Sequence, residues 1–519
     1  MRKIIELMVL PQDAALPEEL KKVVAKKAKL NSGAINHISI LRRSIDARSK
    51  QVKLRLKVEV FINETPEAPD YSIVYPSVND AKKVIVVGAG PAGLFAALGL
   101  IERGLKPIVL ERGKAIGERK KDIAQLYKTL EINTESNYCY GEGGAGTFSD
   151  GKLFTRSSKR GNVRKILETF VAHGASPDIL VDAHPHLGTN KLSAIIVNMR
   201  ESILQSGGEV HFETKVTDFI IHKQTVLGVV DQNAKEYRGV ATVLASGHSA
   251  RDMYELLHKK DIKLEAKDFA VGVRVEHPQA LINSIQYHTS KKDPLLPTAS
   301  YSLVSQVENK GVFSFCMCPG GIIVPAATSN NELVVNGMSN ALRNSPFANS
   351  GIVATVKQEE LVDYQKHGVF AGMEYQKDLE KMAFSAANNS QKAPAQRMID
   401  YVQKQHSASL PKSSYILGLT NAPLHKLLPE NINEALRKAF IEFGKKMRGY
   451  YTKDAIIVGV ESRTSSPIRI PRDKELMQHV QIENLYPCGE GAGYAGGIVS
   501  SAMDGENAAI RIAVSCERN

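Results

Sequence analysis

Three glycines and a carboxylate in the first quarter of the chain have the types and spacing of a dinucleotide site. Gly88, Gly90 and Gly93 follow the apolar run Val84–Val87 and open a second apolar segment. In a strand–turn–helix unit, such glycines permit a tight turn, approach of the backbone to a pyrophosphate, and close helix–strand packing. The free N–H groups at the start of the helix would face the phosphates.

The acid that such a site needs follows on the next apolar run. Pro107–Leu110 ends in Glu111, whose carboxylate can accept hydrogen bonds from a ribose and would repel a 2′-phosphate. Pro91, Ala92 and Arg112 adjoin these positions, and we expect them to contact the cofactor as well. Strand, turn, helix and acid in this order predict a dinucleotide-binding unit.

A second glycine-rich turn, near the C-terminus, resembles the C-terminal flavin motif of the glutathione-reductase-type FAD fold. The run Leu485–Gly491 contains an acid at the end of an expected strand, and further glycines lead into a helix. In that fold the acid binds the ribitol hydroxyls, and the N-terminus of the helix faces the flavin pyrimidine, where reduction builds up negative charge. The residues that the resemblance assigns to these contacts are Gly489, Glu490, Gly496, Gly497 and Ile498.

The middle of the chain resembles the central segment of the same fold. A β-meander is expected from Glu209 to Gln232, and the strand Val240–Ala245 ends in Ser246 and Gly247. The resemblance places the backbone of Val216 against the adenine. Three motifs in this order favour FAD over NAD as the cofactor.

Further segments narrow the resemblance to a bacterial family of FAD-dependent dehydrogenases. The match extends over essentially the whole chain and includes a short βαββ module ahead of the flavin domain. It implies a family and a cofactor but no substrate. The segments that carry it are Gly141–Lys152, Phe315–Gly321, Glu461–Pro467 and Asn484–Ala502.

The loop Gly141–Lys152 is the first candidate for the reaction centre. Its many glycines suit a backbone pressed against a planar ligand, and the resemblance places it beside the flavin ring. A glycine-rich surface turn is the alternative. Lys152 is our preferred charged residue, because it could stabilise a reduced, anionic flavin. The other expected contacts of this loop are Gly143, Gly144, Gly146, Thr147, Ser149 and Asp150.

Arg463 is the second candidate catalytic residue. It follows the apolar strand Ala455–Val460, and its guanidinium could bind a substrate carboxylate or phosphate. A structural ion pair with Glu461 in a polar loop is an equally strong interpretation. His184, His186 and His248 flank expected strand ends, and we interpret each as structural.

Cys316 and Cys318 lie two residues apart on an expected strand, on one face with Ser314. Their Cα atoms would be about 6.6 Å apart, near the upper limit for a disulfide. A redox-active pair, a place in the wall of the substrate pocket, and plain packing all remain open. No group of His, Cys and Asp has the spacing of metal ligands.

Composition sets the remaining limits. Hydrophobic residues make up 43% and charged residues 24%, as in an ordinary globular protein. The net charge is +12, and half of the excess is in residues 1–83, which contain 16 basic and 10 acidic residues. Five sparse cysteines indicate a reducing compartment, and we expect a cytoplasmic protein with no membrane span. Glycines divide the uncharged run Val84–Ile101, which is therefore not a span.

Four segments describe the expected organisation, which is an α/β fold. They are a basic βαββ accessory domain (1–75), the first part of a Rossmann-like FAD-binding domain (80–265), an inserted substrate domain of antiparallel sheet plus helices (266–454), and the second part of the FAD-binding domain (455–519). Helices are expected in the insert at Ala371–Asn388, Ala393–Gln405 and Ile432–Met447.

These observations predict an FAD-dependent oxidoreductase that passes a hydride between a small-molecule substrate and flavin N5. No second G-x-G-x-x-G follows a strand, so NAD(P)H is expected at most as a transient electron donor. Two alternatives stay open. One is an RNA-modifying flavoprotein that binds nucleic acid through the basic N-terminal module. The other is a non-enzymatic FAD protein that relays electrons to a partner.

Overall fold

The computed structural model describes residues 1–155, 158–289 and 293–518. The N-terminal module is a three-stranded antiparallel sheet in the order β1-β3-β2. In β3 every second side chain, such as Leu56 and Val58, is buried beneath α2, whose Leu20 and Val24 complete a small core. The elements are β1 (Arg2–Val9), α1 (Pro11–Ala15), α2 (Pro17–Ala28), β2 (Ile35–Asp46) and β3 (Lys53–Ile62).

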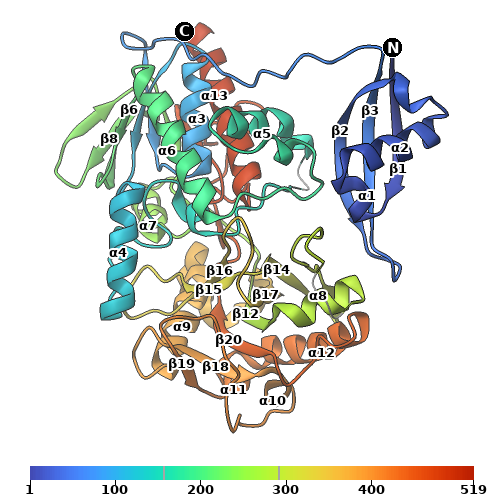
Figure 1. Ribbon diagram of the computed structural model, residues 1–519. Coiled ribbons are helices and arrows are strands. Elements are labelled where there is room, and N and C mark those ends of the chain that lie inside the picture. Colours follow the sequence, from blue (N-terminus) through green and yellow to red (C-terminus); the bar gives the residue numbers. More distant parts are fainter. Residues whose placement is uncertain (156–157, 290–292, 519) are drawn as a thin grey trace.

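A five-stranded parallel sheet, in the order β22-β10-β4-β5-β6, forms the centre of the upper body (Figure 1). Its strands are short and almost wholly buried, because both faces are covered. They are β4 (Lys83–Val87), β5 (Lys106–Leu110), β6 (Glu209–His211), β10 (Ala241–Leu244) and β22 (Leu485–Pro487).

Helices cover one face of this sheet and a β-meander covers the other. On the helical side α3 and α13 pack so closely that a Cβ on Gly505 would lie 2.0 Å from the carbonyl oxygen of Ala92. The meander β7-β8-β9 is a separate antiparallel sheet, so the expectation that it begins at Glu209 is wrong: that residue opens β6 of the parallel sheet. These elements are α3 (Pro91–Ile101), α5 (Val163–Ala172), α6 (Thr189–Gln205), α13 (Ile498–Arg518), β7 (Val216–His222), β8 (Thr225–Asp231) and β9 (Glu236–Arg238); α4 (Ile116–Thr129) and α7 (Arg251–Lys259) flank the sheet.

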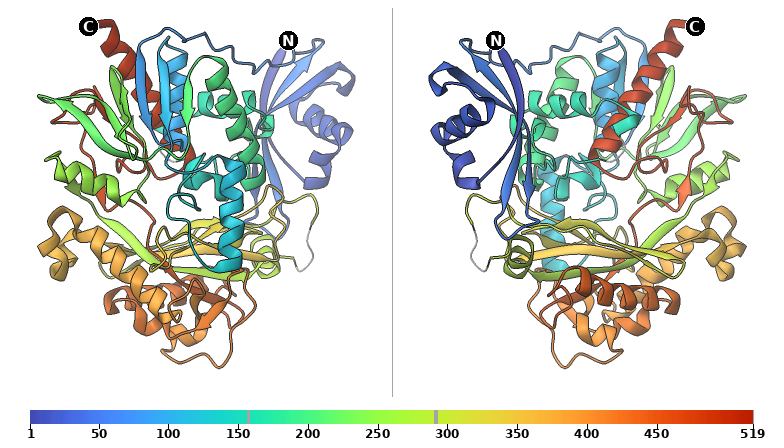
Figure 2. Two further views of the ribbon diagram at one scale, coloured as in Figure 1. Left: turned by 90° about the vertical axis from the view of Figure 1, so that its left-hand side faces the viewer. Right: turned by 90° about the vertical axis from the view of Figure 1, so that its right-hand side faces the viewer.

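A seven-stranded sheet in the order β13-β14-β17-β12-β20-β18-β19 forms the lower body, with α12 against its face away from the parallel sheet (Figure 2). All neighbouring strands are antiparallel except β18 and β19. The strands are β12 (Phe269–Pro278), β13 (Val304–Val307), β14 (Lys310–Cys318), β17 (Phe347–Val356), β18 (Ala393–Arg397), β19 (Leu419–Asn421) and β20 (Ile456–Glu461).

The helices of the lower body are α8 (Gln279–Tyr287), α9 (Ala371–Ala386), α10 (Met398–Val402), α11 (Leu424–Leu427) and α12 (Glu430–Lys446).

The helix expected over Ala393–Gln405 is wrong in its first part. Ala393–Arg397 is strand β18, because it pairs with β20 in the middle of a buried sheet. This tertiary pairing overrides the helical preference of alanine and glutamine. Since β20 itself belongs to this sheet, the sheet extends past the boundary expected at 454.

Two small ribbons connect the bodies: β11 (Glu265–Ala266) pairs with β21 (Ile468–Arg469), and β15 (Ile322–Pro325) pairs with β16 (Val335–Met338). Among the described residues, no helix is both long and apolar enough to cross a membrane.

Candidate functional site

One cavity of about 700 Å³ lies between the ends of the parallel strands and the seven-stranded sheet. That volume is within the range of about 300–1,000 Å³ that is usual for ligand pockets. The sequence-predicted residues that line it are Gly88, Gly90, Pro91, Ala92, Glu111, Arg112, Gly144, Gly146, Ser149, Asp150, Lys152, Val216, Ser246, Gly247, Arg463, Glu490, Gly496, Gly497 and Ile498.

The turn between β4 and α3 has no room for side chains. A Cβ on Gly88, whose φ is +104°, would lie 2.5 Å from the carbonyl oxygen of Ala245. A Cβ on Gly93 would lie 1.8 Å from the carbonyl oxygen of Gly88. Gly93 does not line the cavity but lets the helix pack on the strand. The first N–H groups of α3 have no acceptor within the helix and are open to the cavity.

The Glu111 carboxylate holds together the loops around this turn. Its oxygens accept hydrogen bonds from the backbone N–H groups of Ala89, Gly113 and Gly141, each at 2.9 Å. A carboxylate has about four acceptor positions, so one is left for a ligand hydroxyl.

Arg112, beside Glu111 in the same wall, is fixed by protein partners. Its guanidinium pairs with Glu135 at 2.7 Å and Asp252 at 2.9 Å, and lies 4.1 Å from the ring centre of Tyr140. These contacts hold the Arg112 side chain in place in the cavity wall.

At the other end of the cavity the Glu490 side chain makes no hydrogen bond to any described residue. The imidazole of His248 lies beside it, with 3.9 Å between Nε2 and Oε1. Burial raises the pKa of Glu490 to about 7. Burial and the positive charges of Arg463 and Arg251 lower the pKa of His248 to about 3. The carboxyl group therefore points into the cavity next to a neutral imidazole.

The N-terminus of α13 opens on the same end. Gly496 and Gly497 precede it, and the first residues of the helix line the cavity. Gly489 lies behind the wall: its N–H donates to Asp504 at 2.7 Å, and a Cβ on it would lie 2.8 Å from the Cβ of Ala92. Two helix N-termini and one unpaired carboxyl group therefore face a single cavity.

The Gly141–Lys152 loop is held from behind by Arg119, a residue that sequence reasoning missed. Arg119 is fully buried, and its guanidinium donates to the carbonyl oxygens of Asn137, Tyr138, Glu142 and Gly144 at 2.8–3.0 Å. Burial lowers its pKa to about 10. An arginine in an amphipathic helix carries no signal for this role, because its acceptors are backbone atoms of a distant loop.

Several expected flavin contacts of this loop have protein partners instead. Gly143 lies beneath the other residues of the loop. The Thr147 hydroxyl is buried and donates to the carbonyl oxygen of Glu142 at 2.9 Å. The Ser149 hydroxyl donates to the carbonyl oxygen of Gly146 at 2.7 Å. Asp150 accepts from Ser339 and Arg343, so its carboxylate fastens the loop to the lower body.

Lys152 reaches across the cavity wall to the lower body. Its Nζ donates to the carbonyl oxygen of Met317 in β14. No carboxylate among the described residues pairs with it, so its positive charge stays uncompensated at the cavity.

The lower body contributes the opposite wall with Phe315, Cys316, Cys318, Asn336 and Gly337. Cys316 has φ +43°, and the pairing of β14 with β17 shifts register between Phe315 and Cys318. This bulge breaks the alternation of side chains, so the expectation that both cysteines share one face is wrong. Cys316 is exposed to the cavity, whereas Cys318 is buried.

The two thiols are free, and the Cys318 Sγ lies 3.2 Å from the carbonyl oxygen of Cys316. Desolvation by the protein atoms that surround the thiol raises the pKa of Cys316 to about 12. At neutral pH the thiol is therefore protonated.

Arg463 is saturated by ion pairs, but not with Glu461 as one interpretation expected. Its guanidinium pairs with Glu380 at 2.7 Å and Glu332 at 3.0 Å and also donates to Thr328 at 2.9 Å. Glu461 instead forms a fully buried pair with Arg274 at 2.8 Å.

Arg251 of α7 also binds Glu380, at 2.8 Å. The cluster of Arg251, Arg463, Glu332 and Glu380 joins the two bodies beside the cavity. Its two positive charges balance its two negative charges, and no N–H of Arg463 is left for a substrate anion.

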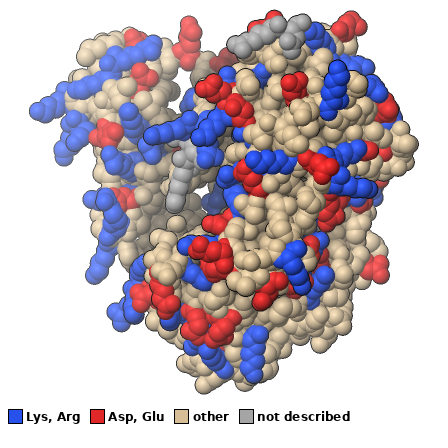
Figure 3. Space-filling model, turned by 180° about the vertical axis from the view of Figure 1, so that it is seen from behind, with Lys and Arg blue, Asp and Glu red and all other residues tan. Residues whose placement is uncertain are grey.

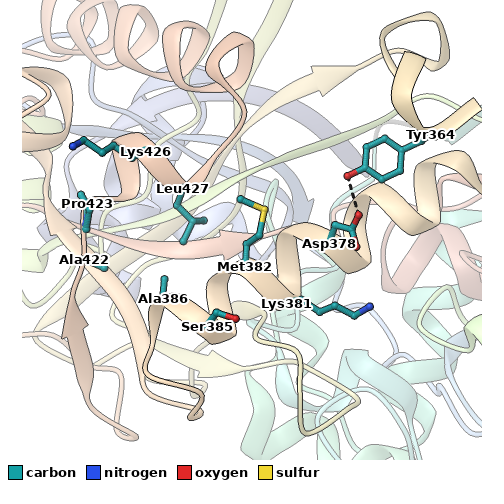
Figure 4. Close-up of a pocket in the computed structure, with 10 residues that line it drawn as sticks. All are labelled: Tyr364, Asp378, Lys381, Met382, Ser385, Ala386, Ala422, Pro423, Lys426 and Leu427. Atoms are coloured by element: carbon teal, nitrogen blue, oxygen red, sulfur yellow. Dashed lines mark hydrogen bonds between the residues drawn. The ribbon is translucent and has the colours of Figure 1, made fainter.

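A separate groove of about 650 Å³ lies on the far side of the lower body, between α9 and α11 (Figure 4). Met382 and Leu427 point into it, and the Tyr364 hydroxyl donates to Asp378 at 3.0 Å at one end. None of the predicted cofactor residues lines it. Among the described residues, no group of His, Cys, Asp and Glu could hold a metal ion.

The fold and the cavity define a dinucleotide-binding protein, and comparisons with known proteins give the family. The descriptions "FAD binding domain" and "FAD-dependent protein, C-terminal domain-like" match residues 83–125 and 268–464, and a domain of unknown function matches residues 1–61. An uncharacterised protein of Clostridium beijerinckii is 40% identical over an alignment of 506 residues that covers 94% of this chain and 94% of that protein. The chain therefore belongs to a family of FAD-dependent proteins.

Two solved structures that align with most of the chain have low sequence identity and low TM-scores. The flavin-dependent brominase Bmp2 is 14% identical, with a TM-score of 0.36 over 85% of this chain and 80% of that chain. A geranylgeranyl bacteriochlorophyll reductase-like protein of Thermoplasma acidophilum is 12% identical, with a TM-score of 0.37 over 85% and 79% of the two chains.

The residues of the cavity fit FAD. The turn at Gly88 leaves space for a pyrophosphate at the N-terminus of α3, and Glu111 keeps an acceptor for a ribose hydroxyl. The unpaired Glu490 carboxyl suits the ribitol hydroxyls, and the N-terminus of α13 suits the pyrimidine edge.

Proposed function

We propose that the protein is an FAD-dependent oxidoreductase of the glutathione-reductase type that transfers a hydride between a small-molecule substrate and the flavin. The observation that carries the proposal is the single cavity, in which two helix N-termini, Glu111 and Glu490 face a wall formed by a second body.

FAD, when bound, supplies the acceptor or donor of the hydride. The residues of the chain do the rest. Glu111 and α3 bind and orient the adenosine diphosphate part, and Glu490 and α13 orient the ribitol and ring. Lys152 holds a positive charge at the cavity, which favours an anionic reduced ring.

The substrate would lie against the wall that contains Phe315, Cys316 and Asn336. Phe315 supplies an apolar surface, and the Asn336 amide and protonated Cys316 thiol are hydrogen-bonding groups. Arg463 is a positioning residue in this proposal rather than a substrate ligand, because its partners are Glu332 and Glu380.

The test is an anaerobic visible spectrum of the purified protein during addition of NADH and then NADPH. Bleaching of the flavin band within seconds would support a reductase that takes electrons transiently from a pyridine nucleotide. A flavin band that neither nucleotide bleaches, but that a reducing metabolite does bleach, would support a substrate-reduced dehydrogenase. A band that only a protein partner bleaches would favour the electron-relay alternative and contradict the proposal.

A further inference from the structure

The N-terminal module is joined by its β2 strand to a segment of the upper body. The backbone N–H of Arg43 donates to the carbonyl oxygen of Val181 at 2.8 Å, and its carbonyl oxygen accepts from Ala183 at 2.9 Å. The Arg43 side chain pairs with Asp182 at 2.7 Å and with Asp178 at 3.2 Å. The residues from 181 to 183 therefore continue the edge of the module's sheet.

The same segment runs directly into the cavity wall. The N–H of Leu153 donates to the carbonyl oxygen of Pro185 at 2.9 Å, and Lys152 pairs with His186 in an isolated antiparallel bridge. Lys152 and Phe154 line the cavity. Backbone hydrogen bonds thus lead from β2 of the module to the cavity in two steps.

The module also touches the lower body. Val52, at the start of β3, is buried in the core of the seven-stranded sheet domain, and the His288 ring bonds to the carbonyl oxygen of Ala47 at 3.0 Å. Figure 3 shows a hollow between the module and the rest of the molecule, with Lys and Arg side chains on both of its sides. The module is therefore fixed against both bodies at the side of the cavity where Lys152 lies.

Two positive charges in this region lie outside the ion pairs of the described residues, although the charge of Arg42 helps to lower the pKa of Glu6. Arg343 is neutralised by Asp150 and Arg43 by Asp182, whereas Arg42 and Lys152 form no ion pair with any described residue. His184 lies near both of them. Its ring packs on Phe154 with 4.8 Å between ring centres, and burial together with the charges of Arg42 and Lys152 lowers its pKa. The His184 ring, packed on Phe154, thus lies within the electrostatic reach of both cations.

We propose that the N-terminal module forms one wall of the entrance to the flavin cavity, and that Arg42 and Lys152 select a substrate that carries a carboxylate or a phosphate. This rests on the proposed oxidoreductase function and assigns a role to the module. Lys152 lines the cavity and Arg42 lies on strand β2 of the adjoining module, and two such cations would raise the local concentration of anions and speed their arrival. The basic excess of the module then has a small anion, rather than RNA, as its ligand.

The experiment measures reoxidation of the chemically reduced, FAD-loaded full chain by two outer-sphere oxidants of opposite charge. Ferricyanide and hexaammineruthenium(III) each accept one electron, so two ions reoxidise one flavin, and protons return to solvent. Arg42→Glu reverses one charge at the entrance. Lys27→Glu makes the same change on the exposed side of α2 and serves as the matched control.

We expect Arg42→Glu to slow ferricyanide by at least about twofold at low ionic strength and to accelerate hexaammineruthenium(III), because reversal of one charge acts on multiply charged ions. Lys27→Glu should change neither rate. Inorganic phosphate and malonate, added at constant ionic strength, are the competitors. Slowing of ferricyanide by phosphate alone indicates a phosphate-bearing substrate, and slowing by malonate indicates a carboxylate-bearing one.

Equal rates in the two variants, or no competition by either anion, would overturn the anion entrance. That result would leave the proposed function intact, because the chain would still bind a reducible flavin. A chain that binds no FAD would instead refute the proposed function before these rates are measured.

Discussion

Glu490 and His248 face each other in the cavity wall, with 3.9 Å between Oε1 and Nε2, yet they are not an ion pair at neutral pH. The imidazole has a pKa of about 3 and is uncharged, while the carboxyl group has a pKa of about 7. The chain thus keeps an acceptor for FAD hydroxyls, because the burial of this acid outweighs the stabilising positive charge of Lys267.

Replacement of that acid should stabilise the FAD-free protein in a pH-dependent way. A carboxyl pKa raised from 4.5 to about 7 means that the folded state loses stability as pH rises from about 4.5 to 7, and the deficit is complete above pH 7. Glu490→Gln removes that deficit. We expect a gain of about 1–3 kcal/mol in the free energy of unfolding at pH 8 and little change at pH 5. Thermal unfolding at the two pH values measures this.

The same variant should bind FAD about tenfold more weakly, because an amide oxygen is a poorer acceptor than a carboxylate. Titration of the FAD-free protein with FAD, followed by flavin absorbance, gives the affinity. An equal stability gain at both pH values would contradict the buried-acid account, and unchanged FAD affinity would contradict the ribitol contact.

Gly93→Ala should abolish FAD binding and lower stability by about 2 kcal/mol or more, because the new Cβ would overlap the carbonyl oxygen of Gly88 at 1.8 Å. Gly117→Ala is the matched control: Gly117 is exposed in α4, and a Cβ there meets nothing within 4 Å. Urea unfolding and flavin content are measured for both. Similar behaviour of the two variants would be incompatible with the packing of this turn.

Local spacing was enough to predict the parts of the site that are contiguous in the chain. The glycines of the β4–α3 turn, Glu111 and the glycines before α13 all belong to short strand–turn–helix units whose geometry is set by neighbouring residues. The fully buried Arg119 could not be predicted, because its acceptors are backbone atoms made available by the folded loop. Nothing in the surrounding residues marks it apart from other arginines.

Pairings between distant segments account for the errors. One of the two interpretations of Arg463 paired it with the neighbouring Glu461, but its partners Glu332 and Glu380 lie 131 and 83 residues away. The helix expected at Ala393 is a strand because of its pairing with β20, and the bulge at Cys316 depends on its partner β17. None of these contacts leaves a periodic signal in one segment.

Arg463→Met should lower the free energy of unfolding by about 3–5 kcal/mol, because it leaves Glu332 and Glu380 buried with too little positive charge. Arg164→Met, which removes an exposed pair with Glu168 on α5, should cost less than about 0.5 kcal/mol. Chemical denaturation compares them. If Arg463→Met kept full stability and lost only turnover, Arg463 would be a substrate ligand after all.

The cysteines should behave as five free thiols. Titration of the denatured protein with a thiol reagent should give five groups with and without prior reduction, because all five cysteines are free and, at the β14 bulge, Cys316 is exposed whereas Cys318 is buried. An increase of two after reduction would show a disulfide and revive the redox-pair interpretation.

The central claim, that FAD occupies the cavity between α3 and α13, is tested most directly by the flavin content of the purified chain. After reconstitution with FAD and removal of the excess, the bound flavin is released by heating and measured by its absorbance. The result should be one FAD per chain for the native protein and for Gly117→Ala, and none for Gly93→Ala. No bound flavin in the native protein, or equal flavin in Gly93→Ala, would contradict the account.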